Sequence, residues 1–131
     1  MRFRSLLALG FALAVAAPLL AHHSFSAEYG NEPANLTGAV TKIEWQNPHV
    51  FFYIDVRDEQ TGKVTNWALE MGAPAVIQRN GWTRNSMKIG DIVTVTGTKA
   101  KNGKPLANAR SVVLTKTGKK LGAGSSEGVT P

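Results

Sequence analysis

The chain of 131 residues contains no cysteine. Thiolate chemistry, iron–sulfur clusters and cysteine-based zinc or type 1 copper sites are therefore excluded, because each of them needs a sulfur ligand. Disulfides are excluded as well, so the fold must be stabilised by packing alone. Any metal that this protein binds must be held by nitrogen or oxygen atoms.

Patterns that accompany common enzyme chemistry are also missing. Ser24, Ser86 and Ser111 lack a surrounding nucleophile signature, and the carboxylates show no recognisable catalytic pairing. Glycines such as Gly62 lie in predicted turns and not in a phosphate-binding loop. We therefore expect a binding protein and not an enzyme, with any catalysis supplied by a bound metal.

Basic residues are not gathered into a patch, although the formal net charge is +6. The densest cluster, Lys99, Lys101 and Lys104, surrounds a predicted turn. A nucleic-acid surface would need a concentrated basic patch with aromatic side chains between the charges. We expect no nucleic-acid partner.

Only one long apolar run occurs, at residues 6–20, behind two arginines and ahead of a small residue, Ala21. This pattern is typical of a secretory signal peptide, predicted at residues 1–21, and its apolar core is too short for a comfortable membrane span. Cleavage after Ala21 makes His22 the first residue of the mature protein. We expect a periplasmic or secreted protein that keeps no membrane span after cleavage.

Residues 35–115 carry the pattern of one small β domain. Alternating apolar, β-branched and aromatic residues, separated by turn residues, predict five strands at residues 36–43, 50–56, 64–70, 92–97 and 107–115. Residues 73–81 have proline near the start and glycine at the end, which predicts a short helix between the third and fourth strands. This order is typical of an all-β, five-stranded OB-like Greek-key barrel, and an open β-sandwich is the main alternative.

The flanking segments have weaker patterns. Residues 22–34 show no sustained period and contain Gly30, Asn31 and Pro33, so they are predicted to form an extended N-terminal arm. Residues 116–131 are rich in glycine, serine and lysine, which predicts a flexible C-terminal tail.

Aromatic side chains could fill the core or form a binding surface. Alternation favours the core for most of them, since Phe52 and Ile54 share one face of their strand while Phe51 and Tyr53 share the other. A possible partner or ligand surface comprises Trp45, Asn47, Trp67, Trp82 and Arg84.

The histidines His22, His23 and His49 are the candidate metal ligands. An N-terminal histidine chelates through its amine and its ring nitrogen, which suits tetragonal Cu(II), and either other histidine could add a nitrogen. Cleavage one residue earlier, after Leu20, would leave an Ala-His-His terminus that also binds Cu(II). The alternative is that His49 makes only structural hydrogen bonds and that the histidine pair belongs to a processed linker.

Several stretches resemble a family of small exported bacterial proteins that contain a domain of unknown function. The resemblance rests on His-His-Ser-Phe, Trp-x-Asn-Pro-His and Gly-Asp-x-Val-x-Val-x-Gly, and it covers about residues 22–115. It brings no established activity with it, and the expected OB-like fold is also similar to exported barrel families that bind ligands or partners without catalysis. It also implies that five residues belong to the family's own pattern: His22, His23, Asn47, Pro48 and His49.

Two functions of different class follow. The first is an exported, periplasmic module that binds a metal ion, Cu(II), through its mature N-terminal histidines. The second is a metal-free module whose surface binds a periplasmic protein or an envelope partner.

Overall fold

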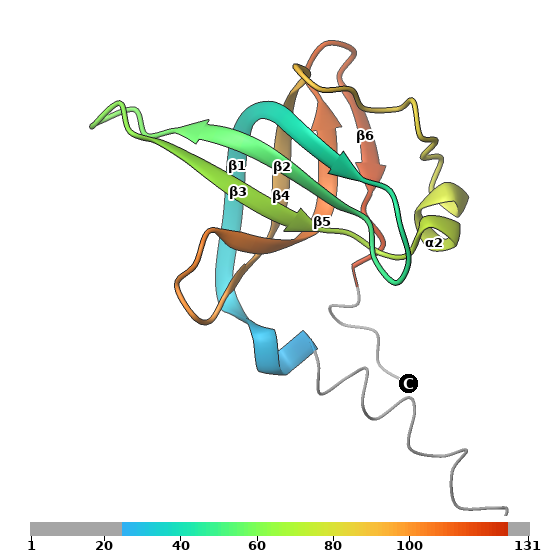
Figure 1. Cartoon of the computed structure of the whole chain (residues 1–131), viewed down its shortest axis with the longest axis horizontal. Coiled ribbons are helices and arrows are strands. Elements are labelled where there is room, and N and C mark those ends of the chain that lie inside the picture. The colour runs from blue at the N-terminus through green and yellow to red at the C-terminus, as the bar shows by residue number, and fades with distance from the viewer. Residues whose placement is uncertain (1–24, 126–131) are drawn as a thin grey trace, which may run out of the picture.

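The structure is a computed structural model that describes residues 25–125. After one helical turn at residues 25–28, the elements are β1 (Tyr29–Glu44), β2 (Phe51–Arg57), β3 (Val64–Glu70), α2 (Pro74–Arg79), β4 (Ile92–Ala100), β5 (Leu106–Leu114) and β6 (Lys119–Gly122) (Figure 1). The predicted all-β class is confirmed, because one six-stranded sheet accounts for most of the fold. In this part of the chain, no helix has the length and apolar character needed to cross a bilayer.

Five strands pair in a closed cycle. β1 is antiparallel to both β2 and β4, β2 pairs with β3, and β4 pairs with β5. The cycle is completed by a parallel pairing of β3 with β5, in which Leu69 lies opposite Ala107. β6 pairs with the second half of β5, from Ser111 to Leu114. As a result, the end of β3 lies between β2 and β5, and the candidate site forms at this place.

β1 is long enough to serve two partners, pairing first with β4 and then with β2. Its register shifts between Val40 and Lys42. Gly38 lies just before this shift, and a Cβ there would stand 2.1 Å from the carbonyl oxygen of Asp55. Only glycine allows the two backbones to approach this closely.

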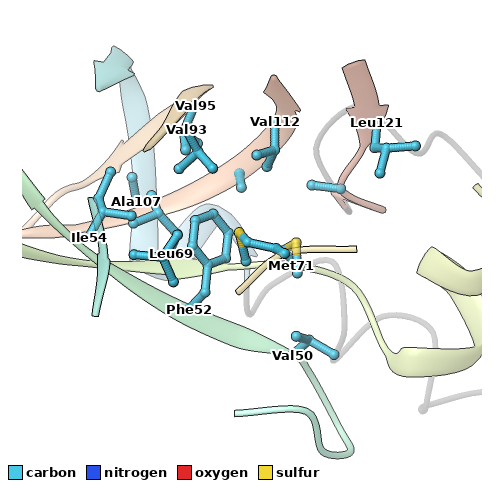
Figure 2. Packing of buried hydrophobic residues seen from close by; sticks show 14 of the residues in the cluster. Val50, Phe52, Ile54, Leu69, Met71, Val93, Val95, Ala107, Val112 and Leu121 are labelled. Carbon is cyan, nitrogen blue, oxygen red and sulfur yellow. The ribbon is translucent and has the colours of Figure 1, made fainter. Parts of the chain in front are cut away.

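Alternation along β2 divides core from surface as predicted. Phe52 and Ile54 are fully buried, whereas Phe51 and Tyr53 are only partly buried. Figure 2 shows the two buried side chains packed among residues from other strands and from the segments beside β2 and β3: Val50, Leu69, Met71, Val93, Val95, Ala107, Val112 and Leu121.

α2 lies where a helix was predicted, and Trp82 follows it. Pro74 occupies the first turn, and Gly81 ends the segment at a φ of 96°. Trp82 is only 2% exposed, and its indole N–H donates to the carbonyl oxygen of Gly122 at 2.9 Å. The prediction of a surface role for Trp82 is therefore wrong. Its neighbours in sequence are exposed, but its own side chain enters the core beside Ile77.

The predicted flexible tail, residues 116–131, is wrong in its first part, because Lys119–Gly122 form β6. Leu121 is 5% exposed, and the carbonyl oxygen of Ala123 accepts the Gly72 N–H at 2.8 Å. One buried leucine and a set of main-chain hydrogen bonds are enough to order a segment with the composition of a tail.

The predicted N-terminal arm, residues 22–34, is wrong in its second part. The chain from Tyr29 onward belongs to β1, because β4 supplies its hydrogen-bonding partners. Lys99 and Glu32 add an ion pair of 2.7 Å across the two strands. The predicted signal peptide and the first part of the arm, with His22 and His23, lie outside the described residues.

Candidate functional site

His49 lies near the end of the loop between β1 and β2. The next residue, Val50, is tied to the chain after β3 by two main-chain hydrogen bonds: its N–H donates to the Gly72 carbonyl at 3.0 Å, and its own carbonyl accepts the Met71 N–H at 2.8 Å. These bonds are independent of side-chain identity. They hold His49 beside Glu70, the last residue of β3.

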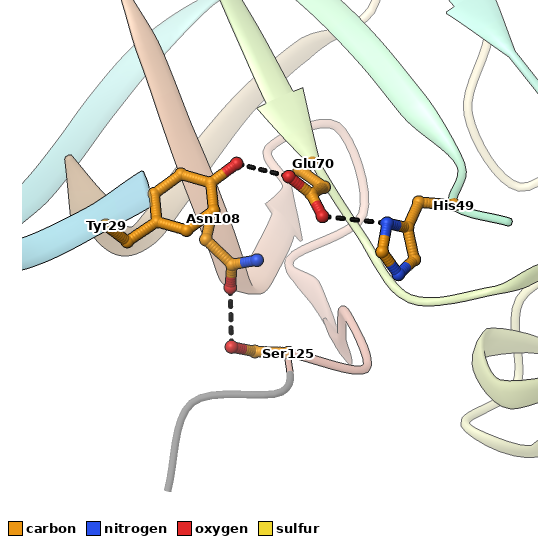
Figure 3. Close-up of polar contacts among 5 residues, drawn as sticks. All are labelled: Tyr29, His49, Glu70, Asn108 and Ser125. Carbon is orange, nitrogen blue, oxygen red and sulfur yellow. Dashed lines mark hydrogen bonds and ion pairs between the residues drawn. The ribbon is translucent and has the colours of Figure 1, made fainter. Parts of the chain in front are cut away.

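His49 and Glu70 form the centre of the site. The Nδ1 atom of His49 lies 2.8 Å from Oε1 of Glu70 (Figure 3). The histidine side chain is 47% exposed, whereas the glutamate side chain is 11% exposed. A buried carboxylate therefore holds one nitrogen of a ring whose other nitrogen points away from it.

Tyr29 binds the second oxygen of the same carboxylate. Its hydroxyl donates to Oε2 of Glu70, and the tyrosine is 3% exposed. Burial raises the pKa of Tyr29 far above its usual value, and the hydrogen bond to Glu70 raises it further. The hydroxyl consequently stays protonated and remains a donor to Glu70.

Glu28 is a second carboxylate at this place, at the end of the helical turn that precedes β1. Burial raises the pKa of Glu28, the negative charge of Glu70 raises it further, and His49 lowers it. Glu28 directly precedes Tyr29, whose hydroxyl binds Glu70, and this adjacency places it at the same part of the fold. We call Glu28, Tyr29, His49 and Glu70 the histidine corner.

The C-terminal end of the described chain reaches the same region. Asn108 lies opposite Glu70 in the β3–β5 pairing, and its Oδ1 accepts a hydrogen bond from the Ser125 hydroxyl at 2.5 Å (Figure 3). Asn108 is 2% exposed, so this contact ties the end of the described chain to the buried residue opposite Glu70.

The histidine corner can present one nitrogen ligand or one proton-accepting nitrogen. A histidine whose one ring nitrogen is held by a carboxylate is the usual form of a metal-bound histidine. Within residues 25–125, no group of three histidine, aspartate or glutamate side chains could hold a metal ion.

The other carboxylates that could add oxygen ligands are engaged elsewhere. Glu44 forms a 2.6 Å ion pair with Lys42, and Asp55 accepts the side-chain amide of Asn66 at 2.9 Å. Sequence reasoning did not identify Tyr29. The register of the predicted hairpin, counted from its turn, could have aligned Glu70 with the start of β2.

The structure brings together only some of the residues of the predicted partner surface. Trp45 packs against the core at its edge, and the Arg84 guanidinium lies 6.0 Å from the centre of its ring. Asn47 is exposed in the same loop as Trp45, and Trp67 is partly buried on β3. Trp82 is buried and does not contribute to a surface.

These features define a small all-β protein that carries one exposed histidine held by a buried carboxylate. The chain belongs to a family of unknown function, DUF6152, whose family model matches residues 11–109. The resemblance to an uncharacterised family is therefore confirmed, although the match begins within the predicted signal peptide and ends in β5. No curated protein matches the chain.

Proposed function

We propose that this protein is an exported, periplasmic module that holds Cu(II) between His49 and its mature N-terminal histidines, His22 and His23. The proposal is carried by the pairing of His49 with Glu70, which leaves Nε2 of the histidine directed away from the carboxylate. Metal-bound histidines in proteins commonly have this arrangement, since the carboxylate orients the ring and increases its basicity.

The position of Glu28 supports the participation of the N-terminal histidines. Glu28 directly precedes Tyr29, which binds Glu70, and His22 and His23 precede Glu28 by six and five residues. An extended chain spans about 3.3–3.6 Å per residue, so these two segments cover at most about 22 Å and 18 Å. Covalent geometry alone therefore keeps the histidine pair within reach of the histidine corner.

The donor types favour copper. Removal of a signal peptide at residues 1–21 would free the amine of His22, and that amine and its imidazole form a chelate. Nitrogen donors in a tetragonal arrangement suit Cu(II), and its affinity for such donors exceeds that of the other divalent metals of its row. His23 and His49 would supply the remaining nitrogens.

For the fold, we propose an OB-like Greek-key barrel. The support is the closed pairing cycle of β1, β2, β3, β5 and β4, together with the position of α2 between β3 and β4. In this reading, β6 is an addition to the five-stranded plan, and the histidine corner lies at one rim of the barrel.

The test is native mass spectrometry of untagged protein, secreted through its own signal peptide, with stoichiometric copper and a competing chelator. We expect a mature mass that begins at His22 or Ala21 and retains one copper ion. His49→Ala should weaken binding about tenfold or more, the scale seen when even the partner of a metal-bound histidine is removed. One residue added ahead of His22 should weaken binding too, because it destroys the chelate.

Gln46→Ala is the matched control, since Gln46 is exposed in the loop of His49. This variant should bind copper like the wild-type protein. Wild-type affinity in both the His49→Ala variant and the extended variant would contradict the proposal.

A metal-free interaction module is the second candidate, and the contact between Arg84 and Trp45 favours it. Tryptophan and arginine are enriched among the residues that contribute most to protein interfaces. In a pull-down from envelope extract, Arg84→Ala should lose the partner while His49→Ala retains it. Retention by the Arg84→Ala variant would exclude this surface.

A further inference from the structure

We infer that Glu70, held by Tyr29, is a positioning residue that keeps neutral His49 in the Nδ1-protonated tautomer and so presents Nε2 as the electron-pair donor. The use of this donor for copper rests on the proposed function. The tautomer itself does not, because it follows from contacts within the metal-free protein.

The first step concerns the hydrogen bonds of the Glu70 carboxylate. An ionised carboxylate only accepts hydrogen bonds, and Glu70 accepts one from Tyr29 and one from Nδ1 of His49. Nδ1 must therefore carry the proton. A neutral imidazole has a single N–H group, so Nε2 is left with its lone pair. In water, a free histidine side chain prefers the opposite tautomer, and Glu70 thus reverses the default.

The second step concerns the rigidity of Glu70. Its backbone lies between two strands, opposite Phe51 of β2 and Asn108 of β5. The residue is 8% exposed and bound by Tyr29, which itself is 3% exposed. Rotation of the carboxylate away from His49 would leave buried polar groups without partners, which is unfavourable. The acceptor for Nδ1 is therefore fixed before any ligand arrives.

The sheet contains a second tyrosine–glutamate pair that serves as an internal comparison. The Tyr53 hydroxyl donates to Glu44 at 3.2 Å, and the same carboxylate forms an ion pair with Lys42. This pair has the same two residue types, lies on a more exposed part of β1 and β2, and is bound to a lysine where the histidine corner has an imidazole. Substitutions there should leave His49 unchanged.

The test is the tautomer of His49 in metal-free protein with ¹⁵N-labelled histidine. Long-range ¹H–¹⁵N correlation spectra separate protonated from unprotonated ring nitrogens at a pH where the ring is neutral. Comparison with the His49→Ala protein identifies the signals of His49. We expect a protonated Nδ1 and an unprotonated Nε2. A wild-type spectrum of the Nε2-protonated form would overturn the inference without any variant.

The double variant Tyr29→Phe/Glu70→Met removes the carboxylate together with the hydroxyl that it would leave unpaired. We expect His49 to shift to the Nε2-protonated tautomer in this protein. The matched control Tyr53→Phe/Glu44→Met should preserve the wild-type tautomer. An unchanged tautomer in the Tyr29→Phe/Glu70→Met protein would overturn the inference.

Copper titration of the same proteins separates this inference from the proposed function. If both hold, Tyr29→Phe/Glu70→Met weakens copper binding about 10–100-fold while the control pair does not. Suppose instead that the double variant changes the tautomer, but that this variant and His49→Ala both keep the wild-type copper affinity. That result would contradict the proposed function and support the role of Glu70.

Discussion

Replacing Leu121 by alanine would show how far the folded domain extends into the C-terminal segment. Leu121 lies in β6, is 5% exposed and belongs to the buried core cluster. Its side chain also contacts the turn after α2, since a Cβ on Gly81 would stand 3.5 Å from Cδ2 of Leu121. The substitution removes most of this side chain and leaves a cavity between β6 and α2.

The expected loss follows from the burial of the side chain. Replacement of a buried leucine by alanine costs about 2–5 kcal/mol, and sites that can relax lie at the lower end of this range. β6 pairs with β5 alone among the described strands, so some relaxation is available, and we expect about 2–4 kcal/mol. In a domain of this size, a loss of that magnitude lowers Tm by roughly 10 °C or more.

Urea unfolding followed by tryptophan fluorescence measures the effect, with Lys120→Ala as the matched control. Lys120 is exposed in the same strand, and its substitution should change the free energy of unfolding by less than about 0.5 kcal/mol. A Leu121→Ala protein as stable as the control, with an unchanged m value, would refute the assignment of β6 to the cooperative unit.

Two further predictions concern β1. Gly38→Ala places a Cβ 2.1 Å from the carbonyl oxygen of Asp55. We expect this variant to lower the free energy of unfolding, measured in urea, by about 1–3 kcal/mol or more. Gly30→Ala should cost far less, because its Cβ meets only a lysine side chain at 3.4 Å. Equal stability of the two variants would contradict the close approach at Gly38. Because folding raises the pKa of Tyr29, its contribution to stability is complete below its ordinary pKa of about 10 and declines as the pH rises above it. The urea midpoint of the wild-type protein should therefore fall more steeply with pH than that of Tyr29→Phe between about pH 9 and pH 11. If the two midpoints fall in parallel, Tyr29 titrates alike in the folded and unfolded states, and the prediction is wrong.

The central strands could be predicted because their local patterns agree with their final environment. β2 and β3 coincide closely with the predicted strands at residues 50–56 and 64–70. The turn between them is specified by its own chemistry, since the Asp58 carboxylate accepts the N–H groups of Gln60 and Thr61. α2 was predictable for the same reason, from its first-turn proline and the glycine after it.

The first part of β1 and the whole of β6 could not be predicted, because their order depends on partners far away in the sequence. The first residues of β1 contain glycine, asparagine and proline, yet they pair with β4 more than sixty positions later. β6 has a single buried apolar side chain, Leu121, within a run of lysine and glycine. Local composition is uninformative when a remote strand supplies the hydrogen bonds.

The candidate site was predictable in part. His49 stood out because a proline precedes it at the start of a strong strand, and Glu70 could have been aligned with it through the hairpin register. Nothing in the sequence around Tyr29 indicates its role, because it contacts Glu70, a residue 41 positions later in the chain. The roles of His22 and His23 stay a prediction from sequence.

The closeness of Ser125 to the histidine corner has a practical consequence for handling this protein. Ser125 contacts Asn108, which lies opposite Glu70, and six residues follow it. Those residues can span about 20 Å at most, so a polyhistidine purification tag at the C-terminus would be tethered within reach of His49. Such a tag would offer imidazoles at high effective concentration and compete for any metal at the corner. Binding measurements on C-terminally tagged protein would then report the tag together with the protein.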